Sequence, residues 1–334
     1  MNTLILNQQQ VSELLTMEEC MMVMDKAFLA LSAGDVLLPL RQVVWLPGGK
    51  SALAVMPSFS GDIQAMGVKV ISVFPENLGT GMDSHQGAVL LFDAANGCLR
   101  AIIDATEITA IRTAAVSGIA TRALSRPDAC DLAILGSGVQ ARTHLQAMLI
   151  ARKIKRIRVW SRNPDHAEQF AQREGEQHTI AIEVCKSAAE AVSGADIICT
   201  VTAAKSPVLK GEWLREGVHI NAIGTFGPST REVDSAVVAR SLLFVDRKES
   251  AVNEAGDYLI PLKEGSIGPD HIRGELADVL SGKVAGRNSP EDITLFKSLG
   301  LAVEDLASAH YLYEKAVEKQ IGTFVELGGL RHDS

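Results

Sequence analysis

A glycine-rich turn lies near the middle of this 334-residue chain, between a short apolar run and a segment with helical spacing. It follows the predicted strand 131–135, which is apolar after Asp131, and Ala141 provides the third small residue of the pattern. In a strand-turn-helix unit, the first glycine permits a tight turn and the second lets the backbone approach a pyrophosphate. The free N–H groups at the start of the helix then face the anion. An ordinary strand-to-helix turn is the alternative, but the flanking pattern favours a dinucleotide site formed by Gly136, Ser137, Gly138, Val139 and Gln140.

The end of the next predicted strand, residues 156–160, bears on which dinucleotide binds. An acidic residue there usually accepts hydrogen bonds from the ribose of NAD, whereas a cationic, hydroxyl-bearing site accommodates the 2′-phosphate of NADP. Ser161, Arg162 and Asn163 follow the strand without an acid. Arg162 can fork onto the phosphate while Ser161 and Asn163 donate beside it, so we expect NADP, preferably as NADPH. NAD stays possible, because Asp165 could fold back to a ribose.

Composition excludes several classes of function. Hydrophobic residues make up 47% of the chain and the formal net charge is -8 without basic runs, so nucleic acid and anionic membranes are not expected partners. The chain shows no basic segment before an apolar one and no run of about 18 apolar residues, so we expect a cytoplasmic protein. The five cysteines and eight histidines have no metal-ligand spacing. We expect reduced thiols and no metal.

The elements that must position the glycine turn follow two different patterns. From residue 131 to 246, predicted strands and helices alternate, as a doubly wound parallel sheet requires. Before that, a helix at 16–33 precedes extended runs that meet without helices between them, which predicts an antiparallel or mixed sheet. Long helical patterns cover 105–124 and 298–319.

These patterns predict an α/β fold with two domains. A Rossmann domain with a doubly wound parallel sheet is expected over residues 121–304. Residues 1–120 together with 305–334 are expected to form an α+β domain.

Further motifs are spread along the chain: Ser84-His85-Gln86, Ile111-Arg112-Thr113-Ala114-Ala115-Val116-Ser117, Gly211-Glu212-Trp213, His219-Ile220-Asn221-Ala222-Ile223-Gly224, Phe296-Lys297-Ser298-Leu299-Gly300 and Val303-Glu304-Asp305. With them the chain resembles the ornithine cyclodeaminase/mu-crystallin family over nearly its whole length. The resemblance implies that hydride passes between a nicotinamide and the α-carbon of an imino or amino acid. It also implies that the α+β domain binds the substrate and forms a homodimer.

Three cations match the substrate-binding positions of that family: Arg41, Lys69 and Arg112. The resemblance implies that the two arginines hold the substrate carboxylate through planar pairs. Lys69 would orient the C=N group and supply a proton.

Without the resemblance, these cations have plainer interpretations. Arg41 would be a charge on an edge strand. Lys69 lies between Val68 and Val70, so alternation places it on the opposite face of a strand, where a lysine is usually solvated. Arg112 lies in an apolar helix and needs a partner.

The same resemblance implies contacts with the cofactor outside the glycine turn. His85 is expected to bind the cofactor and not to act as an acid. The residues that match are Ser84, His85, Gln86, Thr113, Thr202, Thr225 and Ser298.

One position departs from the cyclodeaminase pattern. Ornithine cyclodeaminases carry an aspartate two residues after the glycine of the fifth strand, where this chain has Phe226. A phenyl ring cannot take a proton or pair with an ammonium group. The mu-crystallin branch also lacks that aspartate and keeps the Arg231-Glu232 pair. The chain therefore resembles ketimine reductases, which act on Δ1-pyrroline-2-carboxylate and Δ1-piperideine-2-carboxylate.

Three other functions stay open from the sequence. An amino-acid dehydrogenase or reductive aminase, of the alanine dehydrogenase or iminosuccinate reductase type, would use the same residues. Ornithine cyclodeaminase is disfavoured by Phe226. A catalytically silent NADPH-binding protein is disfavoured by the intact cations.

Overall fold

The computed structural model describes residues 2–77 and 79–329. It divides into two compact units, of which unit 2 runs from Thr113 to Gly300 and unit 1 comprises the residues before and after it. One boundary lies inside helix α3 (Ala105–Leu124), which the sequence pattern predicted with the same limits.

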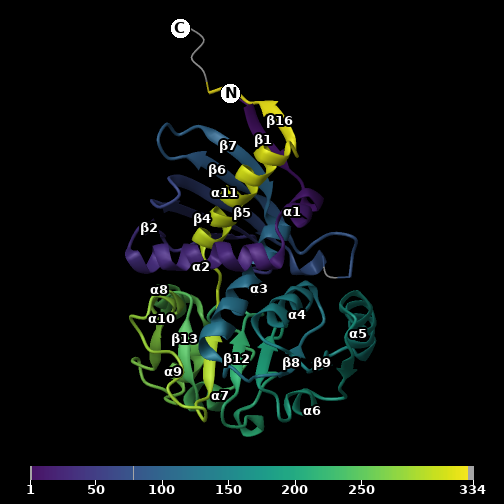
Figure 1. The fold of residues 1–334 in the computed structure, drawn as a ribbon. Helices are drawn as coiled ribbons and strands as arrows, with labels where there is room; N and C mark the ends of the chain where they lie inside the picture. Colours follow the sequence, from purple (N-terminus) through teal and green to yellow (C-terminus); the bar gives the residue numbers. More distant parts are fainter. Residues whose placement is uncertain (1, 78, 330–334) are drawn as a thin grey trace. The chain divides into compact units, whose positions relative to one another are not determined.

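Unit 2 is the predicted Rossmann domain, with a doubly wound parallel sheet (Figure 1). In the described residues its strand order is β10-β9-β8-β11-β12-β15-β13-β14. The central strands are buried along nearly their whole length, which is typical of parallel strands covered on both faces. The strands are β8 (Asp131–Leu135), β9 (Arg156–Trp160), β10 (Ile182–Val184), β11 (Ile197–Thr200), β12 (His219–Ala222), β13 (Leu242–Val245), β14 (Ile272–Glu275) and β15 (Thr294–Lys297). The helices are α4 (Val139–Ala151), α5 (Pro164–His178), α6 (Ala188–Val192), α7 (Ser235–Arg240), α8 (Lys248–Glu254), α9 (Gly256–Lys263) and α10 (Leu276–Leu280).

Unit 1 is built on a mixed sheet, as predicted, in which β1 pairs with β7 in parallel and the other pairs are antiparallel. Its order is β16-β1-β7-β6-β5-β4-β2, with β3 also paired to β4. Helix α11 lies across β4, β5 and β6 (Figure 1). The strands are β1 (Asn2–Leu6), β2 (Val36–Leu37), β3 (Gln42–Trp45), β4 (Ala52–Ser60), β5 (Ala65–Val73), β6 (His85–Asp93), β7 (Leu99–Asp104) and β16 (Thr323–Glu326). The helices are α1 (Gln8–Leu14), α2 (Met17–Ala33), the first turns of α3, and α11 (Ala302–Lys319).

The end of the chain corrects one prediction. The helical pattern at 298–319 begins as a helix only at Ala302, and the residues before it form β15 and a short segment without regular structure. β15 lies between β12 and β13 in the middle of the sheet. Its last residue, Lys297, is 1% exposed and pairs with Asp257, so a buried charge ends a central strand.

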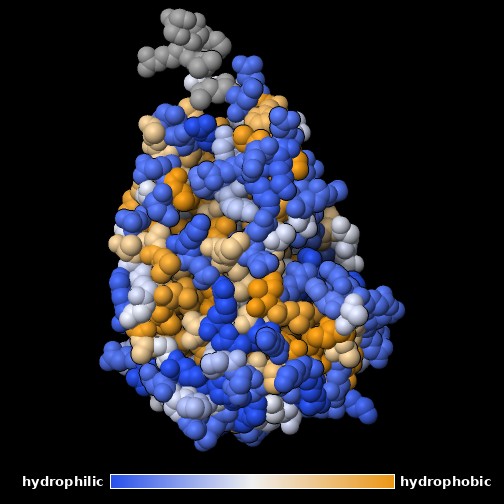
Figure 2. All heavy atoms as spheres, viewed as in Figure 1, coloured by the Kyte–Doolittle hydropathy of each residue, from blue (hydrophilic) through white to orange (hydrophobic). Residues whose placement is uncertain are grey.

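On the face drawn in Figure 2, hydrophobic side chains gather in several groups that polar side chains surround. In residues 2–77 and 79–329, no helix is both long and apolar enough to cross a membrane. The same residues contain no group of potential ligands that could hold a metal ion.

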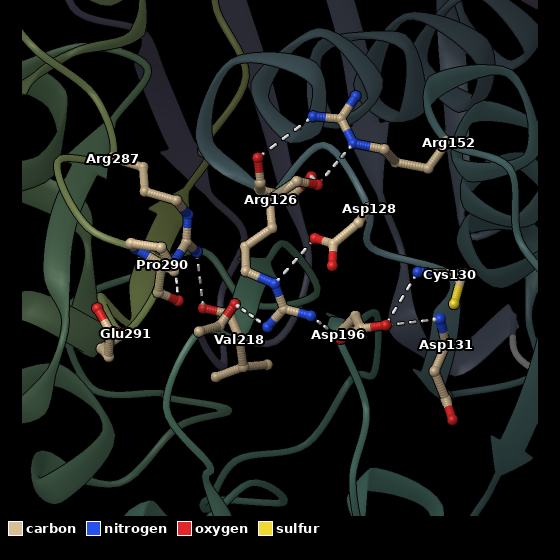
Figure 3. A network of polar contacts seen from close by, with 12 residues as sticks. Arg126, Asp128, Cys130, Asp131, Arg152, Asp196, Val218, Arg287, Pro290 and Glu291 are labelled. Carbon is tan, nitrogen blue, oxygen red and sulfur yellow. Dashed lines mark hydrogen bonds and ion pairs between the residues drawn. The ribbon is translucent and has the colours of Figure 1, made fainter.

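Two arginines cap the carboxyl-terminal end of α3 inside unit 2, and Figure 3 shows one of them, Arg152, at the Arg126 carbonyl. Arg152 donates to the carbonyl oxygens of Arg126 at 3.0 Å and Arg122 at 2.9 Å. Arg287 donates to the carbonyl of Leu124 at 2.8 Å. The last carbonyls of a helix have no partner within the helix, and cations near them are favourable.

Replacing Arg152 with methionine is expected to lower the free energy of unfolding by about 3 kcal/mol, because several part-buried carbonyls lose their donor. Chemical denaturation measures this. Arg156→Met is the matched control, since Arg156 pairs with Glu183 at the surface, and its midpoint should stay at the wild-type value. Equal midpoints for wild type and both variants would contradict the assignment.

Candidate functional site

The glycine turn of unit 2, predicted to bind a dinucleotide, combines a glycine of positive φ with an uncapped helix N-terminus. Gly136 has φ +126°, and a Cβ there would lie 2.7 Å from the carbonyl oxygen of Val201. Gly138 is the N-cap of α4 and has φ −89°. No side chain caps that helix. A Cβ built at Gly138 would have no atom within 4 Å beyond the neighbouring residues of the chain. The first turn of α4, with Val139 and Gln140, therefore presents backbone N–H groups to open space.

Hydroxyl groups link this turn to the end of β9. Ser137 Oγ donates to Ser161 Oγ at 3.0 Å. This bond leaves the Ser161 proton to donate elsewhere. Arg162 is exposed beside it, and Asn163 caps α5 by accepting from the Asp165 N–H at 3.0 Å. Asn163 therefore uses its carbonyl oxygen locally and keeps its amide donors.

Three hydroxyls predicted to meet the cofactor follow β11, β12 and β15, and each donates to a buried carboxylate. Because a hydroxyl carries one proton, each of these oxygens is left to accept a hydrogen bond. They therefore suit amide or hydroxyl donors of a ligand better than phosphate oxygens. The pairs are Thr202 with Glu232 (2.6 Å), Thr225 with Asp257 (3.1 Å) and Ser298 with Asp246 (3.2 Å).

These carboxylates were missed by sequence reasoning, although Glu232 was noted as part of a motif. Glu232 also accepts from the Thr202 and Gly224 N–H groups, both at 2.6 Å. Burial raises the pKa of Glu232, and Lys297 and the Thr202 bonds oppose that rise. Lys297 donates to the carbonyl of Thr225 at 2.7 Å and pairs with Asp257 at 2.9 Å. Glu232, Lys297 and Asp257 together fix the loops that carry Thr202 and Thr225.

Unit 1 holds a buried cluster of opposite charges at the start of α11. Lys69 Nζ lies 2.8 Å from Asp305 Oδ2, and Arg112 Nε lies 3.1 Å from Asp305 Oδ1. Arg112 also pairs with Glu304. The four side chains are at most 5% exposed. Glu304 and Asp305 are thus the partners that Arg112 needs inside an apolar helix. The sequence analysis quoted both acids in a motif but gave them no role.

Lys69 lies on the buried face of β5, which corrects the solvated interpretation. The predicted alternation holds, since Val68 and Val70 point to the opposite face, but that face is the half-exposed one. Burial first, then the charges of Arg112 and Arg41, lower the pKa of Lys69 from 10.5 to about 8, and Asp305 opposes them. Because the charge of Arg41 acts on Lys69, the three predicted cations share one electrostatic site.

The remaining predicted residues are divided between the units. Ser84 and His85 contact each other at 3.0 Å at the start of β6 in unit 1, beside Gln86, which donates to the carbonyl of Asp83. Burial and the charge of Lys69 lower the pKa of His85, which favours its neutral form. Thr113 is a buried residue of α3 in unit 2.

The sequence pattern of the ornithine cyclodeaminase/mu-crystallin family matches residues 1–320. The chain belongs to this family.

Three relatives place this family member among enzymes with known structures or activities. Ketimine reductase mu-crystallin of Mus musculus is 43% identical over 84% of this chain and 86% of its own. The Δ1-pyrroline-2-carboxylate reductase of Thermococcus litoralis, in complex with NADH and L-proline, is 42% identical with a TM-score of 0.94, over 97% of this chain and 100% of that one. An archaeal alanine dehydrogenase dimer with bound NAD is 31% identical with a TM-score of 0.92, over 98% and 100%.

Proposed function

We propose that the chain is an NAD(P)H-dependent reductase that converts Δ1-pyrroline-2-carboxylate or Δ1-piperideine-2-carboxylate to the cyclic L-amino acid. The observation that carries this proposal is the buried cluster of Lys69 and Arg112 on Asp305, with Arg41 nearby. Counting Glu304, these five groups carry three positive and two negative formal charges. The net charge of +1 suits a substrate with one carboxylate.

The chemistry divides between the two units. When bound, the nicotinamide supplies a hydride to the imine carbon. Unit 2 offers the glycine turn and the oriented hydroxyls for the cofactor. In unit 1, Arg41 and Arg112 hold the substrate carboxylate through hydrogen-bonded ion pairs. Lys69 gives its Nζ proton to the imine nitrogen, so that a C–H and an N–H bond form as C=N becomes C–N.

The direct test follows oxidation of the reduced nicotinamide with each cyclic imine and identifies the product by chiral chromatography. We expect L-proline from the five-membered imine and L-pipecolate from the six-membered one. No oxidation with any α-imino acid, despite tight cofactor binding, would favour the catalytically silent alternative.

Amino-acid dehydrogenation is the second candidate, because the alanine dehydrogenase relative has the same fold over the whole chain. It would form the imine in the site from a keto acid and ammonia. Saturable, ammonium-dependent oxidation of the nicotinamide with pyruvate or oxaloacetate would favour it. Ornithine cyclodeaminase remains disfavoured by Phe226, and ammonia release from ornithine would contradict that argument.

NADP is the cofactor that we propose, with NAD as the alternative. Arg162→Ala is expected to raise the dissociation constant of NADPH by about 10-fold and to leave that of NADH unchanged, because the guanidinium would meet only the 2′-phosphate. Fluorescence titration of both cofactors measures this. Lys186→Ala removes another exposed cation of the same unit as a control. Equal weakening of both cofactors by Arg162→Ala would contradict the preference.

We also propose that a second copy of the chain covers the outer face of the unit 1 sheet. This face carries half-exposed apolar residues on β4, β5 and β6. Among them, Phe59, Met66, Val68 and Phe92 help to line a hollow of about 470 Å³. Exposed apolar areas of this kind mark interaction sites. Sedimentation of the purified chain should give the mass of a homodimer, and a monomer would contradict the proposal. The cytoplasmic location of the protein stays a prediction.

A further inference from the structure

The cation cluster of unit 1 is organised around one carboxylate. Asp305 uses one oxygen for Lys69 at 2.8 Å and the other for Arg112 at 3.1 Å. Glu304 pairs with Arg112 through Nη1, whereas Asp305 is the acid whose charge and hydrogen bond raise the pKa of Lys69. Both acids are buried in the first turn of α11, so they differ mainly in which cation they reach.

Resting on the proposed function, we propose that Asp305 is a positioning residue that keeps the buried Lys69 ammonium charged and aimed, so that it can give up a proton during imine reduction. A buried ammonium without a partner tends to lose its proton. Lys69 faces two further cations, which also favour the neutral amine. Asp305 is the nearby group that opposes them, and Thr109 Oγ1, at 3.4 Å, is a weak additional acceptor.

Several charged or titratable groups lie around Lys69, and pH distinguishes their titration from that of Lys69. Arginine stays charged throughout. The pKa of His85 is lowered, so His85 is neutral across the alkaline range. At alkaline pH, kcat/KM falls as Lys69 loses its proton. The substrate also titrates, but it does so equally for every variant. A difference between variants in the pH of this fall therefore reports the pKa of Lys69. The groups are Arg112 and Thr109 on α3, Asp305 and Glu304 on α11, Arg41 before β3 and His85 on β6.

The experiment compares Asp305→Asn with Glu304→Gln in the full chain. Asp305→Asn should move the alkaline limb of kcat/KM to lower pH by about one unit or more, because an opposite charge at this distance is lost. Glu304→Gln should leave that limb at the wild-type pH. The affinity for NADPH should stay the same in both variants, because neither residue is among those predicted to contact the cofactor.

A second readout does not depend on turnover. Carbon-13 NMR of labelled lysines follows the ε-carbon of Lys69, assigned by its absence in Lys69→Arg, and gives its titration midpoint directly. The midpoint should fall in Asp305→Asn and not in Glu304→Gln. If wild type reduces no imine, the proposed function fails, while this titration still tests the role of Asp305.

A matched pair of milder variants covers the case in which Asp305→Asn does not fold. Asp305→Glu and Glu304→Asp each keep the charge and displace it by one methylene. The midpoint of Lys69 should fall only in Asp305→Glu. An unchanged midpoint in the Asp305 variants, or equal shifts in the Glu304 variants, would overturn the proposal.

Discussion

Replacing Lys69 with methionine is expected to lower kcat/KM for imine reduction by about 1,000-fold, the usual range for loss of a positioned general acid. Methionine fills a similar volume on the buried face of β5 but has no ionisable group that could donate a proton. Cofactor affinity should change little, because Lys69 is not among the residues predicted to contact the cofactor. Steady-state kinetics together with NADPH titration measure both effects.

The pKa of Lys69 also predicts how kcat/KM changes with pH. A proton donor works in its protonated form, and the pKa of Lys69 is about 8, so wild-type kcat/KM should fall as pH rises through that value. Lys69→Met should lack this limb. Lys69→Arg keeps the charge with a pKa too high for proton transfer, so it should bind substrate yet stay slow. Near-normal turnover in Lys69→Met would remove the lysine from the mechanism.

Local patterns allowed much of the fold to be predicted. The limits of α3 follow from apolar spacing within the helix itself, and β8 is an apolar run that ends at a glycine turn. β15 was missed because its four residues have no such pattern and end in Lys297. The lysine is tolerated there because Asp257, 40 residues earlier in the chain, neutralises it. A pairing of that kind has no signal in the local sequence.

The candidate site, too, could be predicted only in part from local sequence patterns. Alternation correctly placed Lys69 opposite Val68 and Val70, but which face of the sheet is covered depends on α11, more than 200 residues later. Glu304 and Asp305 follow the start of that helix, where acidic residues are ordinary because they favour the helix dipole. Only the fold shows that they meet Arg112 and Lys69 instead of solvent.

The second large effect is expected at the two glycines of the turn, which the structure assigns different tasks. Gly136→Ala should lower the free energy of unfolding by about 3 kcal/mol, because φ is positive and the new Cβ would meet backbone. The contact is with the Val201 carbonyl at 2.7 Å, and a carbonyl of a neighbouring loop cannot simply rotate away. Cofactor binding should be lost with it, since the turn sets the direction of α4.

Gly138→Ala separates binding from folding. This residue has a negative φ and open space around its Cβ position, so the denaturation midpoint should stay at the wild-type value. If the pyrophosphate lies against Gly138, the added methyl occupies part of its place and should raise the dissociation constants of NADH and NADPH by about 100-fold. The kinetic defect should then be in binding, with the alkaline limb set by Lys69 unchanged. A folded Gly138→Ala variant that binds both cofactors as tightly as wild type would show that the pyrophosphate does not lie against this residue.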